Sequence, residues 1–133
     1  MRLFLLYSIM VYLMISCTGN STSNKNQEDN HPEITFQDSL YNFGTVDRGK
    51  EFTHEFVFTN TGDKNVVINE VEAGCVCTTV PYYSSKAIAP GDTGSVKIKL
   101  ETAGLFGHQA KGIVVRSNAK ESRKRLIIRA YVE

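Results

Sequence analysis

Tryptophan is absent from this chain of 133 residues, and only three cysteines occur in it. Beyond Cys17 the cysteines are Cys75 and Cys77, which are separated by a single residue. An antibody-type immunoglobulin domain carries a buried tryptophan and two widely spaced cysteines that bridge its sheets. The sequence therefore disfavours that particular domain, although other sandwiches of two β-sheets remain open.

The chain also lacks an excess of charge of either sign. Its 15 basic and 14 acidic residues give a formal net charge of +1, so it has no electrostatic reason to bind nucleic acid. Catalytic motifs are missing as well, because no glycine-framed serine, paired carboxylates or phosphate-cradling loop occurs beyond the first apolar segment. We therefore expect neither a nucleic-acid partner nor enzymatic activity.

Long apolar runs are scarce, and the one present extends from Leu3 to Ile15. It is shorter than the ~20 residues that a membrane-spanning helix requires. An arginine precedes the run, and Ser16 and Cys17 end it, which is the order of a secretory signal with a small-residue cleavage site. With cysteine at the first mature position, the segment resembles a bacterial lipoprotein signal. A plain secretory signal and a structural segment are the alternatives.

This interpretation divides the chain into three parts. Residues 1–16 are the expected signal peptide, and residues 17–32 are the expected lipid-bearing Cys17 with a polar tether. Residues 33–133 have the size of one domain. Because stable anchoring takes about two lipid chains, the diacylglyceryl group and further acyl chain of a lipoprotein would suffice. We expect an exported protein anchored in the Gram-negative envelope, at the outer membrane, with the periplasmic or surface face undecided.

After residue 32, apolar and polar residues alternate with a period of two, and no helical pattern competes with it. Turn residues such as Pro90-Gly91 recur between the alternating runs. We also expect Asn60 to Asp63 to close a hairpin and Arg123 to Arg125 to form a solvated hairpin turn. The predicted strands are residues 34–37, 42–46, 52–59, 66–71, 76–80, 96–101, 113–116 and 126–132.

Seven or eight short strands at this spacing predict an all-β fold, an antiparallel sandwich of two sheets. A closed barrel is the alternative.

Several segments that follow one another in a fixed order make the chain similar to a known group. It resembles the bacterial lipoproteins of domain-of-unknown-function family 1573 (DUF1573) over about Thr35 to Val132. The matching segments are residues 56–63 (FVFTNTGD), 75–78 (CVCT), 88–96 (IAPGDTGSV), 104–107 (GLFG) and 113–118 (IVVRSN).

The resemblance implies an immunoglobulin-like β-sandwich. Similar sandwiches in ciliary and centrosomal proteins serve as docking modules, so it also implies binding or scaffolding rather than catalysis. One position departs from the family pattern, since family members usually carry glycine between the two cysteines and this chain has Val76.

The pair Cys75 and Cys77 leaves three interpretations open. In an extended strand, residues two apart lie about 6.6 Å from each other, whereas disulfides prefer about 5.5–6 Å between Cα atoms. We favour two buried, inert thiols. A local disulfide, which the oxidising exported compartment supports, and a functional thiol pair are the alternatives.

The remaining candidate residues are aromatic or titratable. His54 is expected at the rim of a strand and His108 in a turn, and without further ligands we expect no metal and no cofactor. Tyr82 and Tyr83 are a candidate partner surface, or they cover the end of the sandwich.

The function that we expect is that of a membrane-anchored lipoprotein with a non-catalytic binding or scaffolding sandwich. Its partners would be the membrane, through the lipid on Cys17, and an envelope protein or glycan. Two alternatives are a thiol redox or metal-handling protein that uses Cys75 and Cys77, and a carbohydrate- or peptide-binding subunit of an envelope assembly.

Overall fold

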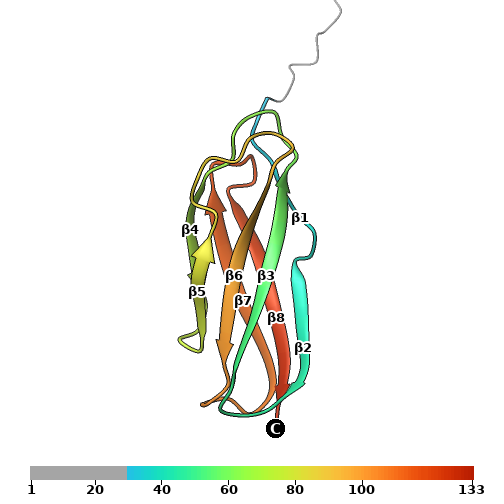
Figure 1. The fold of residues 1–133 in the computed structure, drawn as a ribbon, viewed down its shortest axis with the longest axis vertical. Coiled ribbons are helices and arrows are strands. Elements are labelled where there is room, and N and C mark those ends of the chain that lie inside the picture. The colour runs from blue at the N-terminus through green and yellow to red at the C-terminus, as the bar shows by residue number, and fades with distance from the viewer. Residues whose placement is uncertain (1–29) are drawn as a thin grey trace, which may run out of the picture.

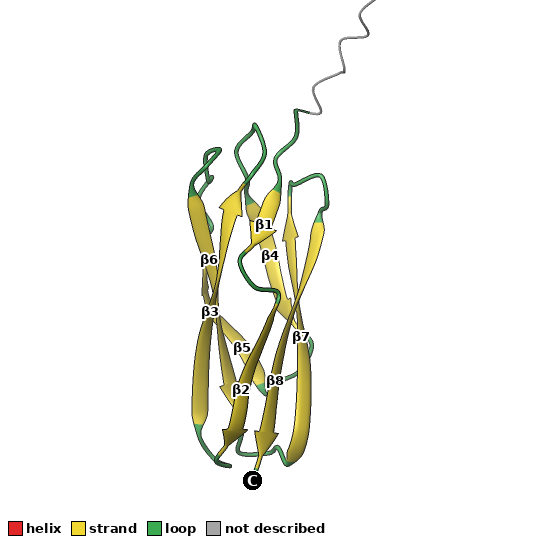
Figure 2. Ribbon diagram, turned by 90° about the vertical axis from the view of Figure 1, so that its right-hand side faces the viewer, coloured by secondary structure: helices red, strands yellow, loops and turns green. Residues whose placement is uncertain are grey.

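The alternating runs form eight strands in the computed structural model of the protein, which describes residues 30–133. The strands make two four-stranded sheets that face each other (Figures 1 and 2). In order across the first sheet, the strands are β1 (Ile34–Phe36), β3 (Glu51–Asn60), β6 (Thr93–Glu101) and β5 (Thr78–Tyr83). In order across the second sheet, they are β2 (Leu40–Val46), β8 (Arg123–Val132), β7 (Gly107–Ser117) and β4 (Ile68–Ala73).

The core lies between the two sheets and consists of the inward-facing residues of the alternating runs. On β3, for example, Phe56 and Phe58 are buried while Glu51 and Glu55 face outward. The most completely buried large side chains are Phe56, Phe58, Ile34, Ile98, Leu100, Ile113, Leu126 and Ile128. The predicted all-β sandwich is therefore confirmed.

One strand pair differs from the antiparallel prediction, because β2 and β8 are parallel. The chain leaves β1 in the first sheet and continues in the same direction into β2 in the second sheet. Figure 2 shows β1 above β2 along the edge of the sandwich that faces the viewer. A strand that switches sheets without turning round meets β8 in parallel orientation, and this arrangement closes one side of the sandwich.

Three local predictions were wrong, each because the chain crosses between sheets or extends a strand. Residues 60–63 do not close a hairpin, since β3 and β4 belong to different sheets. Residues 123–125 begin β8, and the turn before them lies at residues 118–122. Residues 75–77 form a turn between β4 and β5 rather than the start of a strand.

Asn60 connects the loops at the end of the sandwich where the described chain begins. It is fully buried, and its side-chain nitrogen donates hydrogen bonds to the carbonyl oxygens of Lys64 (2.7 Å) and Ile88 (2.8 Å). Its side-chain oxygen accepts one from the Gly62 N–H at 3.0 Å. The segment around Pro32 is fixed to the same end, because the Lys120 N–H donates to the Pro32 carbonyl at 2.9 Å.

The two termini of the described chain lie at opposite ends of the long axis (Figure 1). Residue 30 lies at the top of that view, and the C-terminus lies at the bottom, next to the end of β8. Within residues 30–133, the structure contains no helix that could cross a membrane.

Candidate functional site

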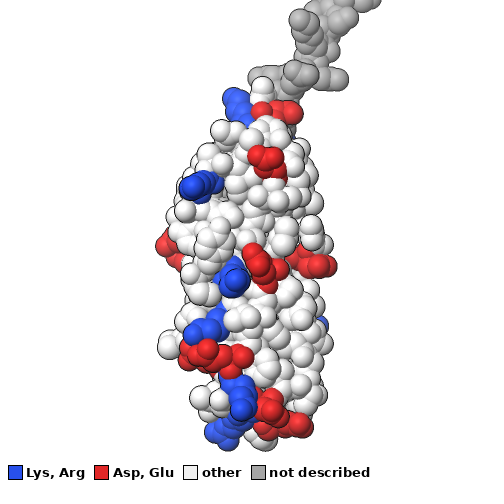
Figure 3. Space-filling view, in the orientation of Figure 1, with Lys and Arg blue, Asp and Glu red and all other residues white. Residues whose placement is uncertain are grey.

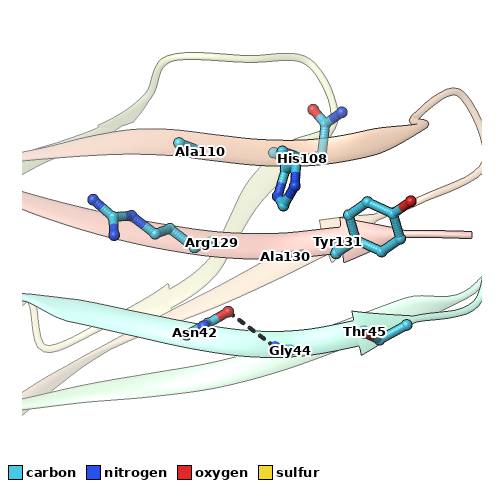
Figure 4. A pocket seen from close by; sticks show the side chains of 9 residues that line it. Asn42, Gly44, Thr45, His108, Ala110, Arg129, Ala130 and Tyr131 are labelled. Atoms are coloured by element: carbon cyan, nitrogen blue, oxygen red, sulfur yellow. Dashed lines mark hydrogen bonds between the residues drawn. The ribbon is translucent and has the colours of Figure 1, made fainter.

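A shallow groove crosses the outer face of the second sheet, over β2, β8 and β7. Its volume is about 650 Å³. Figure 4 shows that its side chains come from these three neighbouring strands. The lining residues are Asn42, Gly44, Thr45, His108, Gln109, Ala110, Arg129, Ala130 and Tyr131.

An irregularity in β2 shapes one wall of this groove. The pairing of β2 with β8 shifts between Asn42 and Thr45, and Gly44 adopts a φ of 75° there. The Gly44 N–H donates to the Asn42 side-chain oxygen at 3.0 Å, as the dashed line in Figure 4 shows. Glycine is favoured here by the positive φ and not by a lack of room, because a Cβ at position 44 would meet nothing within 4 Å. At this bulge the Asn42 side-chain oxygen is therefore held against its own strand.

Two rings stand together at the end of the groove nearest the C-terminus. Tyr131 on β8 pairs across the strands with His108 on β7, and the ring centroids are 4.9 Å apart in an edge-to-face arrangement. The Tyr131 side chain is 41% exposed, so one large aromatic surface remains available to a ligand. His108 was predicted to lie in a turn, and the structure places it on β7 instead.

Arg129 supplies the positive charge of the groove. It is exposed and lies between Asn42 of β2 and Ala110 of β7 in the strand register. Among residues 30–133, no carboxylate forms a salt bridge with Arg129. Because the neighbouring residue on β7 is only alanine, the guanidinium group stands beside open space.

Two other clusters of charged side chains on the sandwich are internally paired. On the same sheet, Arg116 makes salt bridges with Glu70 (3.5 Å) and Glu72 (3.0 Å). On the first sheet, Lys99 contacts Glu51 at 3.1 Å and Glu101 at 3.5 Å. The hydrogen bond with Glu51 is the main cause of the raised pKa of Lys99.

Figure 3 shows acidic and basic side chains interleaved along the face of the molecule that β3 and β6 form. A ligand that binds Lys99 there would have to displace its pairs with Glu51 and Glu101. The groove of the second sheet requires no such exchange.

A disulfide joins Cys75 and Cys77, at the turn between β4 and β5. Their Cα atoms are 5.2 Å apart, because the Thr78 N–H donates to the Cys75 carbonyl at 3.0 Å and closes a turn. The extended geometry that favoured unbonded thiols is therefore absent. Both cysteines are half-buried, and Val76 between them is 98% exposed.

Tyr82 and Tyr83 lie on β5, at the edge of the first sheet, but they do not form one patch. Tyr82 is 53% exposed, whereas Tyr83 packs against the core from the other side of the strand. Only Tyr82 is available to a partner. Cys17 lies outside the described residues.

His54 takes part in an aromatic cluster between the sheets. Its ring stacks on Tyr41 with centroids 3.5 Å apart and meets Phe56 edge-to-face at 4.7 Å. Burial lowers the pKa of His54 below its usual value, and the negative charges of Asp38 and Glu55 reduce this shift without reversing it. In the part of the chain that the structure describes, no group of three or more histidine, cysteine or acidic residues is arranged to hold a metal ion.

The groove was not foreseen as a site from the sequence. The alternation of apolar and polar residues over 126–132 predicts one face toward the core and the other toward water or a second contact surface. The alternation does not show which strand lies beside this one. Arg129 and Tyr131 become neighbours of Asn42 only because β2 pairs with β8. A sheet-switching strand leaves no simple signal in the sequence.

The family model described as "Protein of unknown function (DUF1573)" matches residues 34–132 of the chain. No curated protein matches the chain. Among solved structures, a protein of unknown function from Porphyromonas gingivalis W83 has a TM-score of 0.66 at 15% identity, covering 75% of this chain and 46% of that one. The chain therefore spans less than half the length of that protein.

Two further structures share the fold. The ASH / PapD-like domain 7 of human CEP192 has a TM-score of 0.63 at 11% identity, covering 78% of this chain and 87% of that one. The secreted serine protease VesC from Vibrio cholerae has a TM-score of 0.60 at 14% identity, covering 74% of this chain and 23% of that one. At these identities the likeness shows the fold alone.

Proposed function

The chain belongs to the DUF1573 family of proteins of unknown function, and on that premise we propose that it is a lipid-anchored binding module of the bacterial envelope. The proposed recognition surface is the groove on the outer face of the second sheet. The observation that carries this proposal is Arg129, which is exposed, without a salt bridge among residues 30–133, and beside the aromatic surface of Tyr131.

The positions of the two chain ends at opposite ends of the sandwich suit a module that is anchored near its N-terminus. If lipid on Cys17 holds the chain, the membrane lies on the side of residue 30. The groove reaches the opposite end, since Tyr131 and His108 lie next to the end of β8 (Figure 1). A ligand outside the membrane therefore meets the groove without obstruction from the lipid surface.

The chemistry of the groove favours an acidic glycan. A guanidinium group forms charge-assisted hydrogen bonds with a carboxylate, and the tyrosine ring offers an apolar face to the C–H groups of a sugar. Asn42 and Thr45 supply polar groups for sugar hydroxyl groups. Apart from this ring the groove offers only the small apolar side chain of Ala110, so it has no pocket for the large apolar side chains of a peptide.

The binding proposal is tested by calorimetric titration with trigalacturonic acid and, in parallel, with neutral maltotriose. We expect the acidic trisaccharide to bind, and Arg129→Ala to weaken it at least tenfold, since a hydrogen bond to a charged group contributes about 1.5–3 kcal/mol. The matched control is Lys97→Ala, which removes the same charge from an exposed position on β6 of the first sheet. Equal weakening by both variants would show that only net charge matters.

The anchoring proposal has a separate test. Protein purified from its own host should begin at Cys17 and carry the mass of a diacylglyceryl group and an acyl chain, and Cys17→Ala should leave the membrane fraction. An unmodified Cys17 in the mature protein would remove the anchor from the account and leave the groove untouched.

A further inference from the structure

The turn between β4 and β5 contains chemistry that binding at the groove does not use. Cys75 and Cys77 form a disulfide that encloses only three residues. A disulfide stabilises a fold mainly by shortening the loops of the unfolded chain, and the effect grows with loop length. A ring this small constrains the unfolded chain little, so stability gives a weak reason for its presence.

The disulfide also lies where another protein can reach it. The residue between the two cysteines, Val76, is 98% exposed, and the turn lies at the edge of the sandwich (Figure 1). Structural disulfides are usually shielded, whereas exposed ones are the labile or catalytic ones.

The two sulfurs have different surroundings. Cys77 packs against the hydrophobic core, and its sulfur lies 3.9 Å from the hydroxyl of the buried Thr78. Cys75 does not belong to that cluster, and its sulfur accepts a hydrogen bond from the Cys77 N–H at 3.2 Å. A backbone N–H that points at sulfur stabilises a thiolate there. Cys75 is therefore the outer sulfur and the one better able to hold negative charge.

A second hollow, of about 510 Å³, adjoins the turn on the outer face of the second sheet. The Gly74 N–H donates to the Gly112 carbonyl at 3.0 Å, and a Cβ at position 112 would lie 3.2 Å from the Arg125 guanidinium group. Arg125 thus lines the floor beside the residue that precedes Cys75. Glu72 also lines the hollow, but Arg116 neutralises it at 3.0 Å. The positive charge of Arg125 attracts an approaching thiolate.

We infer that Cys75 and Cys77 form a thiol–disulfide exchange site for protein thiols, with Cys75 as the sulfur that bonds to the substrate. A substrate thiolate attacks the Cys75 sulfur and forms a mixed disulfide, while the bond to Cys77 breaks and its electron pair leaves on the Cys77 sulfur. The second thiolate of the substrate then attacks the substrate sulfur of the mixed disulfide and expels Cys75 as a thiolate.

The net change balances. The substrate dithiol loses two electrons and two protons and becomes a disulfide, and Cys75 and Cys77 become thiols. Run in reverse, the Cys75 thiolate attacks a substrate disulfide. This activity is independent of the groove, so the loss of one function leaves the other in place.

The first test measures how fast dithiothreitol reduces the disulfide in the folded protein and in the protein unfolded by urea. We expect the folded rate to lie within tenfold of the unfolded rate, with the circular dichroism of the sandwich unchanged after reduction. A larger slowing, or reduction only together with unfolding, overturns the inference because the disulfide is then a protected structural bond.

The second test compares the single variants Cys77→Ser and Cys75→Ser as matched controls for each other. With oxidised glutathione at neutral pH, Cys77→Ser should form the glutathione adduct at least tenfold faster than Cys75→Ser, because it keeps the outer, N–H-bonded sulfur. A smaller difference in rate overturns the assignment of Cys75. Trigalacturonic acid binding should be equal in both variants, which separates this result from a failure of the groove.

Discussion

Replacing Asn60 tests whether the loops at the top of the sandwich depend on one buried side chain. Asn60→Ala removes three hydrogen bonds, to Lys64, Ile88 and Gly62, while the backbone bonds of residue 60 remain. At about 1 kcal/mol each, these bonds give an expected loss of about 3 kcal/mol in the free energy of unfolding. The Ile88 carbonyl keeps its bond from the Val66 N–H at 2.9 Å, so this acceptor is not left unpaired.

Asn60→Asp separates hydrogen bonding from volume. The carboxylate keeps the bond from Gly62 but turns a negative charge toward the two carbonyl oxygens that the amide nitrogen contacts. Burial and this repulsion should raise the pKa of the introduced carboxyl group in the folded state above its unfolded value, so the folded state binds the proton more tightly. Stability of this variant relative to wild type should therefore rise as the pH falls toward the ordinary aspartate pKa of about 3.9.

The assay is urea unfolding followed by circular dichroism and tyrosine fluorescence. Asn118→Ala is the matched control, since its side chain also makes two backbone bonds, from Val67 N–H at 2.8 Å and to the Asn65 carbonyl at 3.0 Å, but in an exposed loop. We expect less than about 1 kcal/mol for that control, because water replaces the lost bonds. An equally small loss for Asn60→Ala, or a pH-independent difference for the aspartate variant, would refute the reasoning.

Three further outcomes are expected. Gly62→Ala should raise the rate of hydrogen exchange at the Thr61 amide at least tenfold. A Cβ at position 62 would clash with the His31 carbonyl oxygen and push away residues 31–33, whose Glu33 carbonyl accepts the hydrogen bond from the Thr61 N–H. The stabilisation linked to His54, whose pKa burial lowers, is fully present above about pH 6.5 and falls as the pH drops below it. Urea unfolding of His54→Phe between pH 5 and 7.5 should show a smaller fall. Tyr131→Ala should weaken trigalacturonic acid binding at least fivefold in calorimetry, whereas Tyr82→Ala, at a more exposed tyrosine on the other sheet, should not.

Much of the fold could be predicted from the alternation of apolar and polar residues along the chain. The strand predicted at residues 52–59 matches the observed β3 within one residue at each end, because it has a period of two and one face that must be buried. Pairing across strands was not predictable in the same way. The switch of β1 into β2 occurs at residues 37–39, where Asp38 and Ser39 indicate a break but not that the chain changes sheets, and it produced the one parallel pair among the described strands.

The candidate site was harder to foresee than the fold, for the same reason. Arg129 and Tyr131 are ordinary outward residues of an alternating strand until β2 and β7 place Asn42 and His108 beside them. The cysteines show the opposite case. Their spacing was visible at once, but their geometry depended on a turn at residues 75–78, which a β-branched residue such as Val76 disfavours.

Whether the groove on the second sheet binds an acidic glycan can be observed residue by residue in a backbone NMR titration of the isotope-labelled protein with trigalacturonic acid. We expect saturable shifts of the amide signals of five residues on β2, β7 and β8 of the second sheet, namely Asn42, Gly44, His108, Arg129 and Tyr131, with the amide signals of β3 and β6 unchanged. Shifts centred on the first sheet, or none at ligand concentrations up to about 10 mM, a Kd range that corresponds to only about 3 kcal/mol of binding, would contradict it.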